Sequence, residues 1–253
     1  MESNHSCCQM LKLSLSKLVM EAVGTMLFTM FFTSLSQPVI LLGLWITNIF
    51  MWKISGSHFN PAVTFAYLFR RDESQMKWDQ VLAYCVAQTL GAFVGALLVN
   101  FYTFDLFELT YQNDFFLRAL IQEGLSSFMY VFFFMTNTDQ KLLFSEEPAI
   151  NCFILSSAYI GARTMFYGNM PKATSYGAVM NPAVAIGIQM STLLNNGFSA
   201  WNSIYLYPTI PFGASFLAVL FYELIYKKTR AILDHEEDSD GAGVHDDNMG
   251  EHD

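Results

Sequence analysis

The chain has 253 residues, of which 53% are hydrophobic, 16% are aromatic and only 14% are charged, with a formal net charge of −9. An average soluble domain carries roughly 25% charged residues, so this composition argues against a water-soluble globule, and the negative charge argues against a nucleic-acid binder. The charge is unevenly distributed, because nine of the 22 acidic residues and no Lys or Arg lie in 231–253. The remaining 13 acidic residues balance the 13 basic ones, so residues 1–230 are formally neutral. We expect a membrane-embedded body followed by a disordered acidic cytoplasmic tail at 231–253.

Six long apolar runs predict six transmembrane helices, at about 17–36, 38–52, 79–100, 115–135, 148–167 and 202–226. Most of these runs approach the ~20 residues that an α-helix needs to cross a ~30 Å hydrocarbon core. We therefore expect an all-α membrane domain over 15–230, preceded by a cytoplasmic segment at 1–14. It divides into one repeat at about 15–100 and a second at about 115–226.

The basic residues orient these helices in the bilayer. If the N-terminus is cytoplasmic, ten Lys and Arg residues fall inside and three fall outside, namely Arg118, Arg163 and Lys172. Cytoplasmic loops of membrane proteins carry an excess of Lys and Arg. The sequence therefore predicts a multi-pass protein with both termini in the cytoplasm, and leaves open whether the membrane is the plasma membrane or an intracellular one.

Two shorter segments with the same pattern lie between the spans. Residues 55–63 read SGSHFNPAV and residues 176–184 read YGAVMNPAV, so each has a Gly four residues before Asn-Pro-Ala-Val. Asn is a good helix N-cap and Pro is favoured at the first helical position. Each segment therefore predicts a half-helix, at about 61–69 and 182–191, that is too short to cross. The first begins at Asn60-Pro61-Ala62 and the second at Asn181-Pro182-Ala183.

A glutamate lies inside the first span of each half, Glu21 in one and Glu123 in the other. A carboxyl group inside a membrane is costly and needs a partner, and a loop of irregular backbone at that depth needs acceptors for its N–H groups. We expect each glutamate to support the Asn-Pro-Ala loop of its own half. His58 is expected to hold the first loop by hydrogen bonding, with pH gating as the alternative. Three spans per half make an inverted repeat whose half-helices meet at the midplane.

These motifs resemble the aquaporin superfamily of water and small-solute channels, the major intrinsic proteins, over about residues 15–226. The segment ISGSHFNPAVT at 54–64 is close to the family's first signature, and AQTLGA at 87–92 looks like its third-helix motif. The resemblance implies six transmembrane helices plus two half-helices that meet in a pore, usually in a homotetramer within a lipid bilayer. Asn60 and Asn181 would donate hydrogen bonds to passing water, and the half-helix dipoles would exclude ions. It implies passive transport, with no enzymatic activity, cofactor or metal site.

The chain departs from this family at the outer constriction. The second signature of the family continues with an arginine, and here Val184 stands in that place. Spacing from the two Asn residues predicts an apolar constriction made of Ile40, Phe166, Ala178 and Val184. Asn169 is the alternative to Phe166. Such a departure resembles the unorthodox superaquaporin branch. It predicts passage of water and of glycerol, urea or hydrogen peroxide with weak discrimination.

Two further interpretations stay open. Arg163 or Arg118 could supply the missing charge, although the expected position for both is an ordinary interfacial one. The chain could also be a non-conducting, aquaporin-like membrane scaffold or junction protein, although a scaffold has little need of both Asn-Pro-Ala motifs. A secondary transporter would need coupling charges at the midplane. The only candidates there are Glu21 and Glu123, and we expect the two Asn-Pro-Ala loops to occupy both, which argues against a transporter.

Overall fold

The computed structural model describes residues 2–104, 106–109, 116–166, 177–197 and 205–234. Within these ranges the regular structure is helical and contains no β-strand. The helices, in chain order, are α1 Glu2–Thr33, α2 Gln37–Ser55, α3 Pro61–Ala66 with a 3₁₀ turn at Tyr67–Phe69, α4 Trp78–Thr103, α5 Phe116–Asn137, α6 Pro148–Thr164, α7 Pro182–Asn196 and α8 Ile210–Phe221, followed by the π-helical segment η4 Tyr222–Tyr226.

Five helical segments are long and apolar enough to cross a membrane, at 14–33, 37–55, 78–103, 116–137 and 210–234. The sixth expected span, 148–167, forms the shorter helix α6, which ends at Thr164. This helix has 17 residues, and its buried side chains include the polar Asn151, Ser156 and Arg163. The expected span at 202–226 also differs, since its helix begins only at Ile210, directly before Pro211.

The last helix is longer than the sequence predicts. It continues through the π-helical segment to Asp234, so residues 231–234 are helical and not part of a disordered tail. Arg230 Nε lies 3.1 Å from Asp234 Oδ1, four residues further on, which stabilises this additional turn. The predicted tail at 235–253 lies outside the described residues.

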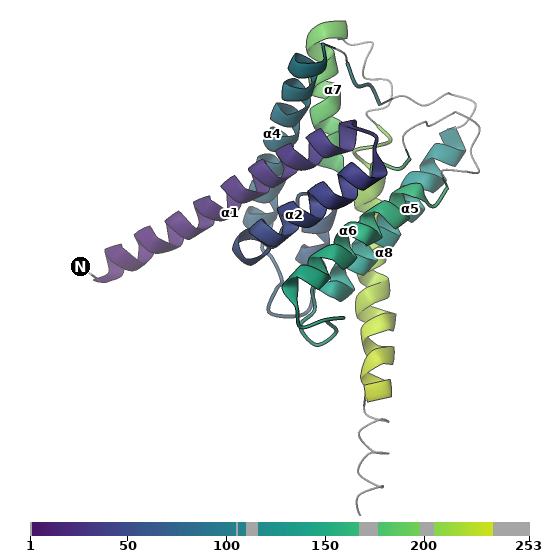
Figure 1. Cartoon of the computed structure of the whole chain (residues 1–253). Helices are drawn as coiled ribbons and strands as arrows, with labels where there is room; N and C mark the ends of the chain where they lie inside the picture. Colours follow the sequence, from purple (N-terminus) through teal and green to yellow (C-terminus); the bar gives the residue numbers. More distant parts are fainter. Residues whose placement is uncertain (1, 105, 110–115, 167–176, 198–204, 235–253) are drawn as a thin grey trace, which may run out of the picture.

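Each half-helix packs against the other half of the chain. The half-helix α3 belongs to the first half and contacts α5 and α8 of the second. The half-helix α7 belongs to the second half and packs along α4 of the first (Figure 1). The long helices pair α1 with α4, α2 with α6 and α5 with α8. This exchange brings the N-termini of α3 and α7 together.

Glycines allow the closest of these helix contacts. A Cβ atom at Gly91 would lie 2.0 Å from the carbonyl oxygen of Ala22, and one at Gly95 would lie 2.5 Å from that of Met26, so α4 touches the backbone of α1 directly. Gly187 brings α7 equally close to Ala92 on α4. Small residues permit such backbone contact between membrane helices, where there is little hydrophobic driving force for association.

Candidate functional site

Both half-helices begin at the Asn-Pro-Ala motifs. The Oδ1 atom of Asn60 accepts from the backbone N–H of Ala62 at 2.9 Å. The Oδ1 atom of Asn181 accepts from Ala183 at 3.0 Å and from Val184 at 3.3 Å. Each Asn is thus a side-chain N-cap followed by proline, as the sequence pattern predicts. The helix α7 runs to Asn196 and is longer than the predicted 182–191.

The two capping asparagines also join the loops to each other. Asn60 Nδ2 donates to the carbonyl oxygen of Met180 at 2.8 Å, and Asn181 Nδ2 donates to that of Phe59 at 2.8 Å. Both asparagines are fully buried. A primary amide carries two N–H groups, so each side chain has one more hydrogen to donate beyond this contact.

The backbone of the two loops has positive φ at two equivalent positions, and the first loop has a third at Ser57. Gly56 and Gly177, each four residues before its Asn, have φ values of +90° and +71°. Phe59 and Met180, each directly before its Asn, have φ values of +48° and +56°. A positive φ is uncommon for residues other than glycine, and it persists where the surrounding structure enforces it. The two loops therefore have a matched, strained geometry that other groups must hold.

The two glutamates hold this geometry. Glu21 accepts the backbone N–H groups of His58 at 3.0 Å and of Phe59 at 2.8 Å. Glu123 accepts the equivalent N–H groups of Val179 and Met180 in the second loop. These are the residues at which each loop turns toward its asparagine, so one carboxyl group supports each half of the site.

The first loop has a further polar network that sequence reasoning did not identify. Gln88 Nε2 donates to Glu21 at 2.8 Å and to the Thr64 hydroxyl at 2.9 Å, and that hydroxyl lies 3.1 Å from His58 Nδ1. His58 is buried, and its ring packs 4.3 Å from that of Tyr67, centroid to centroid. Gln88 lies within the AQTLGA segment at 87–92, and this motif is the sequence feature that could have identified it. The network makes His58 a positioning residue of the loop.

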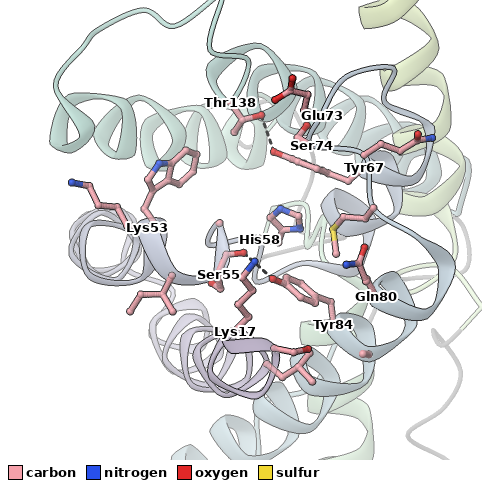
Figure 2. A pocket seen from close by; sticks show the side chains of 18 of the residues that line it. Lys17, Lys53, Ser55, His58, Tyr67, Glu73, Ser74, Gln80, Tyr84 and Thr138 are labelled. Atoms are coloured by element: carbon pink, nitrogen blue, oxygen red, sulfur yellow. Dashed lines mark hydrogen bonds between the residues drawn. The ribbon is translucent and has the colours of Figure 1, made fainter. Parts of the chain in front are cut away.

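A cavity of about 750 Å³ opens beside this first loop (Figure 2). Lys17 points toward the middle of the cavity, Lys53 stands at one side, and His58 lies between Tyr67 and Tyr84 (Figure 2). Two hydrogen bonds fix its walls, one from Tyr84 to the Ser55 carbonyl at 3.0 Å and one from Tyr67 to Thr138 at 2.8 Å. The cavity therefore reaches to within two residues of Asn60. In the predicted orientation it faces the cytoplasm.

The four residues of the expected outer constriction differ in burial. Ile40, Ala178 and Val184 are buried in the apolar core, whereas Phe166 is only half-buried in the turn after α6. Asn169 lies outside the described residues. Ala178 contacts Arg163.

Arg163 is fully buried in the last turn of α6, which corrects the interfacial position expected for it, whereas Arg118 on α5 is exposed. The Nη1 atom of Arg163 donates to the Ala178 carbonyl at 2.9 Å. The Cζ atom of Arg163 lies 4.1 Å from the centroid of the Phe32 ring. Spacing from Asn181 did not identify it because the number of residues between α6 and the second loop could not be fixed from one sequence.

Aromatic side chains pack together next to the second Asn-Pro-Ala loop. The Tyr159 ring packs edge-on against Phe28 at 4.9 Å and against Tyr130 at 5.2 Å. Its hydroxyl donates to the Val179 carbonyl at 3.2 Å. The second loop thus faces both apolar rings and polar atoms, in a region where the side chains are buried.

A cluster of charges joins the segment after the first half-helix to the helical segment that follows α8. Arg70 is only 1% exposed and binds Asp72 at 2.8 Å, and Lys227 lies within 3.5–3.7 Å of Asp72, Asp139 and Glu223. Burial opposes ionisation of Asp72, but hydrogen bonds from Arg70 and Ser74 and the charge of Arg70 outweigh it and lower its pKa to about 2. Among the described residues, no group of three His, Cys, Asp or Glu side chains is arranged to hold a metal ion.

Comparison with known proteins places these features in one family. The family model described as major intrinsic protein matches residues 9–222. Aquaporin PIP2-5 of Oryza sativa subsp. japonica is 26% identical over 190 residues, which cover 69% of this chain and 60% of that protein. Aquaporin TIP1-2 of Zea mays is 29% identical over 179 residues, which cover 69% of this chain and 63% of that protein. The match thus spans about 60% of the length of these curated relatives.

The same arrangement of helices occurs in a solved structure. The X-ray structure of the aquaglyceroporin from Plasmodium falciparum superposes with a TM-score of 0.68. The two proteins are 16% identical, and the superposition covers 84% of this chain and 97% of that one. At this identity the likeness establishes the fold, which is that of six helices and two half-helices.

Proposed function

We propose that this chain, which belongs to the major intrinsic protein family over residues 9–222, forms a passive transmembrane pore. Its permeants are water and small neutral solutes such as glycerol, urea or hydrogen peroxide. The relatives named above are aquaporins and an aquaglyceroporin, which supports this class of permeant. The channel domain is residues 15–230, embedded in a lipid bilayer with both termini in the cytoplasm, and it assembles as a homotetramer.

The observation that carries the proposal is the reciprocal pair of hydrogen bonds between Asn60 and Asn181 and the opposite loops. These bonds orient both amide groups, so the second N–H of each can donate to the oxygen of a passing molecule. The N-termini of α3 and α7 face each other at this point. Because the N-terminus of a helix carries a partial positive charge, the pair opposes the passage of cations.

Other residues have supporting roles in this proposal. Glu21 and Glu123 hold the loops so that their carbonyl groups line the path, and His58 closes the inner end of the 750 Å³ cavity through which solutes enter. Ala178 and Val184 contribute apolar surface near the outer end. Neutral solutes then cross by exchanging hydrogen bonds with water for hydrogen bonds with these carbonyls and with the two asparagines.

The test is the permeability of proteoliposomes that contain the purified full chain. Shrinkage in sucrose gradients reports water flux by stopped-flow light scattering, and glycerol and urea gradients report solute flux. We expect water permeability well above that of empty liposomes. A folded protein that leaves every permeability at the level of empty liposomes would contradict the proposal.

One structural observation favours the alternative of a non-conducting scaffold. Phe28, Tyr159 and Met180 are at most 1% exposed, and the Tyr159 ring packs against Phe28 beside the second Asn-Pro-Ala loop, so little free space remains at this loop. A scaffold predicts a monodisperse oligomer with no flux in the same liposomes. Replacing Tyr159 by alanine separates the two functions, because a channel with a narrow passage gains flux and a scaffold without one gains little.

A further inference from the structure

The position of Arg163 has a consequence for selectivity. Its side chain crosses from α6 to the second Asn-Pro-Ala loop, where Nη1 donates to the Ala178 carbonyl at 2.9 Å. The backbone makes a second contact, because the Ala178 N–H donates to the Arg163 carbonyl at 3.3 Å. The loop and the last turn of α6 are therefore joined at both the main chain and the side chain.

This loop leads directly to the asparagine pair. Ala178 is followed by Val179 and Met180, whose N–H groups bind Glu123, and the Met180 carbonyl receives the hydrogen bond from Asn60. The carbonyls of this stretch point to different partners: that of Ala178 to Arg163, that of Val179 to Tyr159 and that of Met180 to Asn60. Arg163 therefore lies at the outer end of a row of carbonyls whose inner end is the midplane.

A guanidinium group in this place is costly to bury and remains charged. Arginine keeps its proton in proteins, and charged side chains inside membrane domains face the interior or a water-filled path. The face of the Phe32 ring, 4.1 Å from Cζ, stabilises the cation, and Glu123 is close enough to interact with its charge. At the start of α7, where Val184 is fully buried, the side chain is apolar.

We propose that Arg163 is the selectivity-determining cation of the pore, supplied by α6. Its planar group donates hydrogen bonds to the oxygen atoms of neutral solutes and water, and its charge repels cations before they reach the asparagine pair. The assignment rests on the proposed channel function. It changes the expected constriction from an apolar ring to one with a fixed positive charge.

The experiment compares Arg163→Gln and Arg163→Lys with wild type, in proteoliposomes of the full chain. Arg118→Gln, on the exposed face of α5, is the matched control for loss of one outer arginine. Water flux is measured by light scattering, and proton and potassium leak are measured with an internal pH dye and by planar-bilayer conductance. We expect Arg163→Gln to raise the ratio of cation leak to water flux by about tenfold or more. Arg163→Lys retains the exclusion of cations but shifts the ratio of glycerol to water flux, and Arg118→Gln matches wild type.

A role confined to holding the loop gives different results. A folded Arg163→Gln protein, with wild-type elution volume and unfolding temperature and an unchanged ratio of cation leak to water flux, overturns the assignment. If Arg163→Gln does not fold, Arg163→Lys decides, because an unchanged ratio of glycerol to water flux then overturns it. Absence of water flux in wild type is a distinct failure, which contradicts the channel function and this assignment together.

Discussion

Asn60 and Asn181 each donate an amide N–H, at 2.8 Å, to the carbonyl of the residue that precedes the other. Each asparagine also caps its own half-helix through Oδ1. One side chain therefore fixes the start of its own helix and the end of the opposite loop. The two half-helices cannot separate without breaking both contacts.

Replacement of Asn181 by alanine removes a cap and the contact between the loops. Loss of the cap alone costs about 1 kcal/mol, so we expect a lower unfolding temperature in detergent and lower water flux in liposomes. Asn100→Ala is the matched control, because Asn100 Nδ2 binds Ser191 at 2.6 Å away from the asparagine pair. Water flux equal to wild type in Asn181→Ala would show that this amide takes no part in permeation.

Replacement of Glu21 by glutamine leaves the first loop with too few acceptors. The carboxylate uses both oxygens to accept from His58, Phe59 and Gln88, whereas an amide offers one oxygen and turns an NH₂ group toward the remaining donors. Hydrogen bonds to charged groups contribute roughly 1.5–3 kcal/mol each, so we expect a clear fall in the unfolding temperature. The exposed Glu146→Gln serves as the control. Equal unfolding temperatures for both variants would contradict the supporting role of Glu21.

Two glycines provide a matched pair for helix packing. A methyl group at Gly91 would overlap the Ala22 carbonyl, whereas one at Gly161 meets nothing within 4 Å. We expect Gly91→Ala to force α4 away from α1 and to lower both the yield of monodisperse protein and its unfolding temperature. Gly161→Ala is expected to be neutral or stabilising by up to about 1 kcal/mol, because alanine is the better helix former. The reverse order of stabilities would contradict the close approach of α1 and α4.

The charge cluster around Asp72 gives a pH dependence with a defined sign. The pKa of its carboxyl group in the folded protein, about 2, is below the usual 3.8, so the ionised form stabilises the fold at neutral pH. That contribution is complete above about pH 4 and is lost as the pH falls toward 2. We expect Asp72→Asn to lower the unfolding temperature at pH 7 and to lower it much less near pH 2.5. The neighbouring exposed Glu73→Gln is the control, and a pH-independent effect of Asp72→Asn would contradict the ion-pair account.

The sequence was most informative where local chemistry decides the structure. The half-helices begin at Asn60 and Asn181 because capping and proline preferences are local, and the glycine four residues earlier marks the positive φ that each loop adopts. The positions of Glu21 and Glu123 followed from the cost of a buried carboxyl group. The resemblance to the superaquaporin branch stays a prediction.

Features that depend on packing between distant segments were not predictable. The burial of Arg163 requires knowing how α6 meets the second loop, and the spacing from Asn181 pointed to Phe166 or Asn169 instead. The end of the last helix was also missed, because acidic composition suggested a disordered chain from residue 231, whereas Arg230 and Asp234 pair within a continuing helix. In both cases a charged residue has a partner that composition alone does not reveal.

The position of Lys227 in the chain affects the order in which contacts can form during synthesis. It is the shared cation of Asp72, Asp139 and Glu223, and all three precede it in the chain. A ribosome therefore delivers the three negative charges before it delivers the side chain that joins them. Until the helix that carries Lys227 is made, the earlier segments that carry Asp72 and Asp139 lack this contact, so this helix joins them together. A nascent chain halted before residue 227 should accordingly remain open to proteases at the 70–72 loop.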